Sequence, residues 1–388
     1  MIATHPGRPS PADDPSRVDD GDLRADRRRR LFAAMADHDL DVLIMTRPAE
    51  VAFASGARQL WTAGTRPVGP ACVAVRETGR THLLSVWDAD VPPEVGHDDL
   101  LGLFWNPANI AAALAGVPAM ATAERVGTTS STPGLPRLVA GVAPRAEVVD
   151  GSAAMWAARL PKSPAEVARI VAATRIAQAG LTAMVEALRP GVSERDLLAA
   201  YLEAIAGHGA PTPPTEGVVC ATPASGPVAL RRLATAAPIE SGQLVALDAG
   251  GFHRGYEGGV GRTWVAGGAA TGEHRALARR CRTALDAVTA ACRPGATGAD
   301  LIAAWTGTGE PLPPVPLAHG LGLGAEPPVI GGDIGSGVVL DALTVLAATG
   351  WVAQEGVGGF LERDVVLVGE DGPEVLTSYG RGPAGGGA

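Results

Sequence analysis

Residues 244–264 have the sequence LVALDAGGFHRGYEGGVGRTW. Two runs of apolar and small residues, LVALDAG (244–250) and YEGGVGRTW (256–264), flank a short polar turn, which predicts two strands of an antiparallel hairpin. Asp248 lies at the end of the first strand and Glu257 at the start of the second. Side chains alternate along a strand, so Glu257 is directed towards one face of the sheet.

Helices are predicted on both sides of this hairpin. Ser163, Pro164 and Glu166 form a capping box with proline at the first helical position, and the helix that they begin ends at Arg189-Pro190-Gly191. The other predicted elements of this part are helices over 193–207, 272–292 and 297–305 and a closing strand over 360–368. Helices combined with an antiparallel sheet indicate an α+β domain.

The first 150 residues have a different organisation. Short apolar runs suited to buried strands alternate with helical segments, which predicts an α/β domain with a mixed or parallel sheet. The predicted strands cover residues 41–45, 72–77, 81–87, 123–129 and 146–151. The predicted organisation is a disordered arm (1–22), an α/β domain (23–152), the α+β domain (153–380) and a flexible tail (381–388).

Composition excludes several classes of protein. The net charge of −9 opposes non-specific nucleic-acid binding, and no apolar run is long enough to span a membrane. The four cysteines are widely spaced, which indicates neither a disulfide framework nor a zinc knuckle. The single lysine, Lys162, is not part of a GK[ST] phosphate-binding loop. Without a targeting segment, the predicted location is the cytoplasm.

The order of these segments resembles the creatinase / aminopeptidase P / prolidase superfamily, the pita-bread fold. The resemblance rests on the stretch at residues 244–264 and on four other segments of the second domain: RLPKSPAEVARI, LRPGVSERDL, LAHGLGLGAEPP and ERDVVLVGEDGPEVLT. The opening RRRRLFAAMADHDLDVLIMTRPAEVAFASG is similar to the family's first helix, strand and loop. The resemblance implies a pita-bread domain preceded by a smaller creatinase-type α/β domain.

The resemblance also implies that most of the family's metal ligands are absent. Metal-dependent members hold two divalent ions with two Asp, one His and two Glu, of which Asp248 and His319 match. The other three ligand positions fall on Gly259, Ala348 and Arg363. One carboxylate and one imidazole cannot hold a pair of metal ions, so neither a metal nor another cofactor is expected.

Creatinase, a metal-free member, suggests a different site. It places a substrate-binding glutamate in an E-H-D triplet, and Glu362-Arg363-Asp364 has the same register. Glu362 is therefore predicted to be catalytic together with Asp248 and His319, and an irregular strand at 361–364 is expected to bring both Glu362 and Arg363 into the cleft.

The other candidate residues have structural alternatives. Glu257, Tyr256 and Glu355 are candidate substrate contacts, although Tyr256 is also expected to pack and Glu355 to lie near the mouth of the cleft. Asp248 fits a structural role at a strand end equally well, and His319 could be a buried, hydrogen-bonded residue. Arg363 needs an anionic partner, which could be Glu362, Asp248 or a substrate group.

Three readings of the function follow. The first is a metal-independent enzyme on a small polar, amine-bearing substrate, acting by C–N hydrolysis, elimination or ring closure in a specialised biosynthetic pathway. The second is an inactive homologue that serves as a binding or partner subunit, and a residual metallo-aminopeptidase is a third reading. The predicted partners are a small-molecule substrate and either a second copy of the chain or a related or pathway chain, without nucleic acid or membrane.

Overall fold

The computed structural model describes residues 20–57, 72–84, 91–102, 106–129, 134–210, 212–214, 218–222, 228–230 and 232–381. Most of the predicted N-terminal arm and C-terminal tail, and the end of the strand predicted to reach residue 87, lie outside these ranges. Asp20 already begins a helix, so the predicted arm to residue 22 is too long. Within the described ranges, no helix combines the length and apolarity that a membrane crossing needs.

The chain forms two compact units that divide between Arg159 and Leu160. This division lies after the predicted boundary at residue 152, because the short helix α5 (Ser152–Arg159) packs against α1 (Asp20–Asp37) of the first unit. A guanidinium nitrogen of Arg30 in α1 donates to the carbonyl oxygen of Ala158 at 2.9 Å. Residues 153–159 therefore belong to the N-terminal unit.

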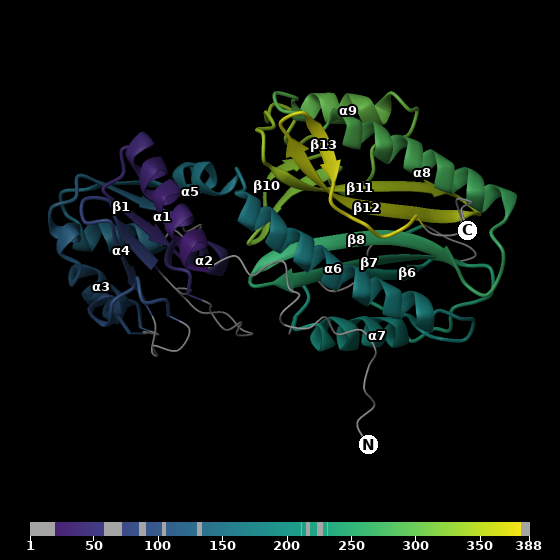
Figure 1. Cartoon of the computed structure of the whole chain (residues 1–388), viewed down its shortest axis with the longest axis horizontal. Coiled ribbons are helices and arrows are strands. Elements are labelled where there is room, and N and C mark those ends of the chain that lie inside the picture. The colour runs from purple at the N-terminus through teal and green to yellow at the C-terminus, as the bar shows by residue number, and fades with distance from the viewer. Residues whose placement is uncertain are drawn as a thin grey trace, which may run out of the picture. The chain divides into compact units, whose positions relative to one another are not determined.

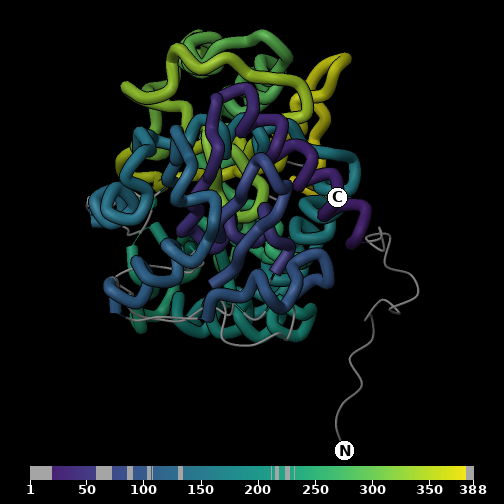
Figure 2. Tube along the Cα trace, turned by 90° about the vertical axis from the view of Figure 1, so that its left-hand side faces the viewer, coloured from purple at the N-terminus to yellow at the C-terminus, as the bar shows by residue number. Residues whose placement is uncertain are grey.

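The N-terminal unit contains a five-stranded mixed sheet in the order β3-β2-β1-β4-β5. Strands β1, β4 and β5 are parallel to one another, and β2 and β3 are antiparallel additions at one edge, as the α/β pattern predicted. Figure 2 traces the Cα atoms of this unit in purple and blue. Its remaining elements are β1 (Val42–Met45), α2 (Pro48–Ser55), β2 (Cys72–Val75), β3 (Arg80–Leu83), η1 (His97–Asp99), α3 (Pro107–Ala115), η2 (Pro118–Ala121), β4 (Arg125–Thr128), α4 (Gly134–Val142) and β5 (Glu147–Asp150).

The C-terminal unit contains an eight-stranded sheet, seven of whose strands follow the order β10-β9-β11-β12-β8-β7-β6, with β13 paired to β12. Its helices are α6 (Pro164–Ala187), α7 (Glu194–Gly207), α8 (Gly272–Ala291) and α9 (Gly298–Thr306). Its strands are β6 (Val218–Ala221), β7 (Leu244–His253), β8 (Tyr256–Val265), β9 (Ala318–Gly322), β10 (Gly324–Ile330), β11 (Val345–Gln354), β12 (Gly358–Gly369) and β13 (Gly372–Val375). Helices and an antiparallel sheet in this unit confirm the predicted α+β domain.

Two helices cover different halves of this sheet. Helix α6 packs on β7 and β8, and α8 packs on β11 and β12, as Figure 1 shows. The predicted hairpin is present, with Asp248 opposite Gly261 and His253 opposite Tyr256. The glycine-rich stretch after His319, for which the sequence pattern predicted no strand, forms the end of β9 and the start of β10.

The close approach of α6 to β8 leaves no room for a side chain at Gly258. A Cβ atom there would lie 2.2 Å from the backbone nitrogen of Thr174, whereas at Gly259 the nearest atom would be 3.5 Å away. Side chains alternate along a strand, so the two glycines face opposite sides of the sheet. Gly258 therefore faces the helix, and Gly259 faces the other side.

Gly258→Ala is expected to lower the free energy of unfolding by about 1–3 kcal/mol, because helix and strand must separate to admit the methyl group. Gly259→Ala is the matched control and is expected to change it by less than about 0.5 kcal/mol. Urea unfolding of the two variants measures the difference. Equal losses would show that the packing of α6 on β8 does not require glycine.

Candidate active site

A cavity of about 270 Å³ lies on the face of the C-terminal sheet that α6 and α8 leave uncovered. Its polar lining comes from five side chains on five strands: Asp248, Glu257, His319, Thr349 and Arg363. Apolar residues close its sides, among them Val315, Pro316, Leu321 and Ala347. We call this cavity the cleft.

Asp248 and Arg363 form an ion pair at the centre of the cleft. The Arg363 guanidinium contacts both oxygens of the Asp248 carboxylate, at 2.8 and 3.0 Å. Its Nε also donates to the hydroxyl of Thr349 at 3.0 Å. Of the three partners considered for Arg363, the structure selects Asp248, because β7 and β12 direct both side chains to the same face of the sheet.

Glu257 is a second cleft carboxylate, and its pKa is raised to about 7. Burial is the largest cause, since it penalises the charged form, and the negative charges of Asp248 and Glu326 act in the same direction. The positive charge of Arg363 and the backbone N–H of Ala325 oppose the rise. Glu257 can therefore accept and return a proton near neutral pH.

Glu257→Gln is expected to make stability less dependent on pH between about pH 5 and 8. The carboxyl has its ordinary pKa of about 4.5 in the unfolded chain and about 7 in the folded one. The folded state therefore binds more protons in this window, and the free energy of unfolding falls as the pH rises.

Glu257 accounts for about 1–3 kcal/mol of this decrease in the free energy of unfolding, because a pKa shift of one unit corresponds to about 1.36 kcal/mol. Urea unfolding at pH 5 and pH 8 should show a larger loss for the unchanged protein than for Glu257→Gln. Glu355→Gln, at an exposed position in the β11–β12 turn, is the control and should behave as the unchanged protein. A pH dependence of Glu257→Gln equal to that of the control would contradict the assignment.

His319 also lies in the cleft, on β9, where its Cα pairs with that of Ala347 on β11. Ala325 of β10 is a lining residue too. The structure thus brings Asp248, His319, Glu257 and Arg363 together.

Glu362 is not in the cleft, and the expected irregular strand is wrong. Strand β12 pairs with β11 without a break over residues 358–367, so alternation points Arg363 into the cleft and Glu362 to the other face. There Glu362 is fully buried and accepts a hydrogen bond from Nε of Arg282 in α8 at 2.8 Å. Its placement indicates a structural ion pair between the sheet and α8.

Tyr256 and Glu355 also lie away from the cleft lining. Tyr256 is buried towards α6 and donates its hydroxyl to Glu166 at 2.7 Å, which agrees with its expected packing role. Glu355 is exposed in the turn that joins β11 to β12. The structure therefore supports neither residue as a substrate contact.

The position assigned to one of the missing glutamates also needs correction. Ala348 is fully buried in the hydrophobic core that includes α8, whereas Thr349 lines the cleft and pairs with Arg363 across β11 and β12. Thr349 is thus the cleft residue of this strand, and sequence reasoning missed it. Side-chain alternation along β11 would have identified Thr349 only if its pairing with Arg363 on β12 had been known.

Sequence reasoning also missed a buried ion pair behind the cleft. Lys162, the single lysine of the chain, pairs with Glu326, and both side chains are almost fully buried. The lysine Nζ also donates to the carbonyl oxygen of Leu160 at 2.8 Å. This pairing leaves Lys162 outside the lining of the cleft and gives it a structural role.

The cleft residues do not fit a pair of divalent metal ions. Both oxygens of Asp248 already contact a guanidinium, and a cation at this position repels a metal ion. Across the part of the chain that the structure describes, no three His, Cys, Asp or Glu side chains form a group that could hold a metal.

The sequence matches the model of metallopeptidase family M24 over residues 168–370, which is more than half of the chain. The chain therefore belongs to metallopeptidase family M24. This finding, with the solved structures below, confirms the resemblance to the pita-bread superfamily. A comparison with curated proteins finds no match.

Solved structures of this superfamily share the fold across nearly the whole chain. A prolidase from Pyrococcus horikoshii OT3 is 20 % identical with a TM-score of 0.75, covering 92 % of this chain and 99 % of its own. An Xaa-Pro dipeptidase from Bacillus anthracis is 18 % identical with a TM-score of 0.74 and the same coverages. Aminopeptidase P from E. coli is 18 % identical with a TM-score of 0.72, covering 93 % of this chain and 96 % of its own.

Proposed function

We propose that this chain is a metal-independent enzyme that acts on a small, amine-bearing substrate in the cleft. The observation that carries the proposal is the Arg363 guanidinium on both oxygens of Asp248. A positive charge held there by hydrogen bonds takes the place of a metal ion and repels one from Asp248.

The remaining charges favour a cationic substrate. Arg363 balances Asp248, so Glu257 supplies a second negative charge when it is ionised. The cleft then carries a net negative charge when His319 is neutral, and a protonated amine would balance it. A cavity of about 270 Å³ suits a small molecule rather than a long peptide.

The acid–base chemistry is assigned to Glu257, with His319 as a second proton carrier. Glu257 replaces Glu362 in this role, because it lines the cleft and its pKa of about 7 suits proton transfer at neutral pH. Such a pair can serve C–N hydrolysis, elimination or intramolecular ring closure. The polar lining favours an enzyme over an inactive partner subunit, whose cleft would be filled by apolar side chains. Association with a second copy or with a related or pathway chain remains a prediction, as does the cytoplasmic location.

A calorimetric titration with metal ions tests the proposal that the enzyme is metal-independent. The unchanged protein is expected to give no saturable heat with Mn²⁺ or Co²⁺. A triple variant, Gly259→Asp with Thr349→Glu and Arg363→Glu, supplies three carboxylates in the cleft and is expected to bind metal. Gly259 has space for the new side chain, since a Cβ there meets no atom closer than 3.5 Å. Stoichiometric binding by the unchanged protein that Asp248→Ala abolishes would overturn the proposal.

A panel of small protonated amines tests the substrate class, with ethylamine, ethanolamine and methylguanidine as probes. An amine that occupies the cleft should raise the midpoint of thermal unfolding, and Glu257→Gln should abolish the rise. Neutral isosteres such as propane should have no effect at equal concentration. Stabilisation that survives in Glu257→Gln would place the amines elsewhere.

A further inference from the structure

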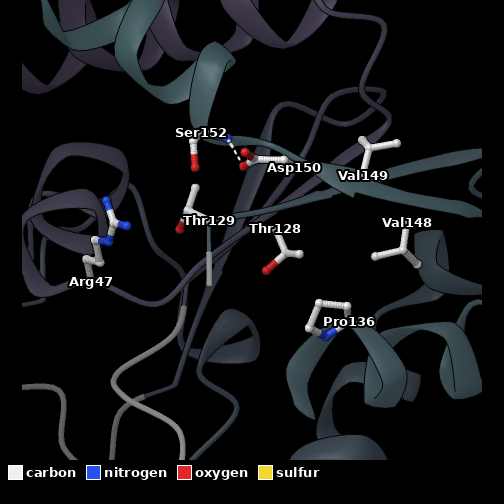
Figure 3. A pocket seen from close by; sticks show the side chains of 8 residues that line it. All are labelled: Arg47, Thr128, Thr129, Pro136, Val148, Val149, Asp150 and Ser152. Carbon is white, nitrogen blue, oxygen red and sulfur yellow. Dashed lines mark hydrogen bonds between the residues drawn. The ribbon is translucent and has the colours of Figure 1, made fainter. Parts of the chain in front are cut away.

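A second cavity, of about 360 Å³, lies within the N-terminal unit. Figure 3 shows its lining, in which Arg47 lies on one side and Pro136 and Val148 on the other. Thr128 and Asp150, the last residues of β4 and β5, lie between them. We call this cavity the strand-end pocket.

The position of the pocket in the sheet is one that favours ligand binding. Strand β1 continues through α2 to β2 on one side, whereas β4 continues to α4 and β5 on the other. The connections therefore diverge between the parallel neighbours β1 and β4, and a crevice opens beyond their carboxyl ends. Arg47 follows β1, and Thr128 ends β4.

Arg47 brings a positive charge to the pocket. Its side chain is 46 % exposed, and its guanidinium lies 3.5 Å from a carboxylate oxygen of the fully buried Glu50. It also stacks over the ring of Trp156, with 5.9 Å between the guanidinium carbon and the ring centroid. These contacts hold the group in place, and a guanidinium has five N–H donors, so a ligand carboxylate can still be bound.

Asp150 brings a negative charge to the same pocket. Its Oδ1 accepts a hydrogen bond from the backbone N–H of Ser152 at 2.8 Å. The hydroxyl and backbone N–H of Ser152 lower the pKa of Asp150, as does the charge of Arg47, so this carboxylate is ionised at neutral pH. A carboxylate offers about four acceptor positions, and Ser152 occupies only part of them.

We propose that the strand-end pocket binds a small zwitterion, such as a free amino acid, with its carboxylate on Arg47 and its ammonium group on Asp150. Pro136 and Val148 then contact the apolar part of the ligand. A phosphate dianion suits the pocket less well, because the Asp150 carboxylate would repel it.

The proposal is tested by calorimetric titration of the full chain with the free L-amino acids, β-alanine and γ-aminobutyrate up to about 10 mM, which reveals millimolar affinity. At least one of them is expected to bind, and its N-acetyl and amide derivatives, which each remove one charge, are expected to bind at least tenfold more weakly. Inorganic phosphate is the comparison ligand. Absence of binding by every zwitterion, or tighter binding of phosphate, would overturn the proposal.

Variants identify the site. Arg47→Ala is expected to weaken binding by about 10- to 100-fold, the range for a lost hydrogen bond to a charged group, and Asp150→Asn should weaken it similarly. Arg145→Ala removes the same charge from an exposed residue that precedes β5, at the far end of that strand, and should leave binding unchanged. Circular dichroism and thermal unfolding without ligand check that each variant is folded. Equal affinities of Arg47→Ala and Arg145→Ala would place the ligand elsewhere.

This proposal is independent of the proposed function, because the two pockets lie in different units. Glu257→Gln should abolish stabilisation by amines in the cleft and leave zwitterion binding unchanged. Arg47→Ala should do the reverse. Loss of zwitterion binding in Glu257→Gln would contradict a separate site.

Discussion

Arg363→Met is expected to lower the free energy of unfolding by about 3–5 kcal/mol at pH 8, the range for removing one member of a buried ion pair. The change leaves the Asp248 carboxylate, which is 6 % exposed, without its cation. It also removes the positive charge that opposes the raised pKa of Glu257, so two neighbouring carboxylates are left together. Urea unfolding measures the loss, which should shrink towards pH 5 as carboxyl groups become protonated.

Two further variants test whether this loss arises from the ion pair. Arg363→Lys keeps the charge but not the paired geometry, and its expected loss is about 1–2 kcal/mol. Adding Asp248→Asn to Arg363→Met removes the unpaired charge and should restore most of the lost stability. A loss below about 1 kcal/mol in Arg363→Met, or additive losses in the double variant, would show that the two groups are not coupled.

Arg282→Met is expected to destabilise the protein by a similar amount, about 3–5 kcal/mol, on the opposite face of the sheet. It leaves Glu362 fully buried without the guanidinium that now contacts it at 2.8 Å. Burial already raises the pKa of Glu362, and Arg282 opposes that rise. Within the described part of the chain, Oε2 of this carboxylate has no hydrogen-bond partner. The charges of Arg262 and Arg381 also favour the ionised form, but neither donates a hydrogen bond to it in Arg282's place.

The structural role of Glu362 has its own controls. Adding Glu362→Gln to Arg282→Met should restore stability, because no buried charge remains. Arg279→Met, at an exposed position of the same helix, should change stability by less than about 0.5 kcal/mol. Neither Glu362→Gln nor Arg282→Met should alter the rise in the midpoint of thermal unfolding that amines cause by binding in the cleft. If Glu362→Gln alone abolished this rise, Glu362 would have to be assigned to the active site.

Much of the fold could be predicted from local sequence. The hairpin over 244–264 and the start of α6 at Ser163 were predictable because turn residues and capping boxes act within a few residues of chain. The glycine-rich strands β9 and β10 were missed, since glycine has no side chain to show alternation. Their pairing with β11 depends on residues far away in the sequence.

The site was only partly predictable for a related reason. Asp248, His319, Glu257 and Arg363 were identified by their residue types and by the order of family segments, and the structure brings them together. Glu362 was misplaced because an irregular strand was assumed where the β11–β12 pairing is continuous. A shift of one residue along a strand moves a side chain to the opposite face of the sheet.

The sequence by itself determined which charged groups this protein has and the local elements that carry them, including a cation at the position of a family ligand. Only the tertiary structure decided the partners: Arg363 binds Asp248, Glu362 binds Arg282, and Lys162 binds Glu326. The physical reason is that these pairs form between residues distant in the chain. Their contacts depend on strand register and helix packing, which local sequence does not encode.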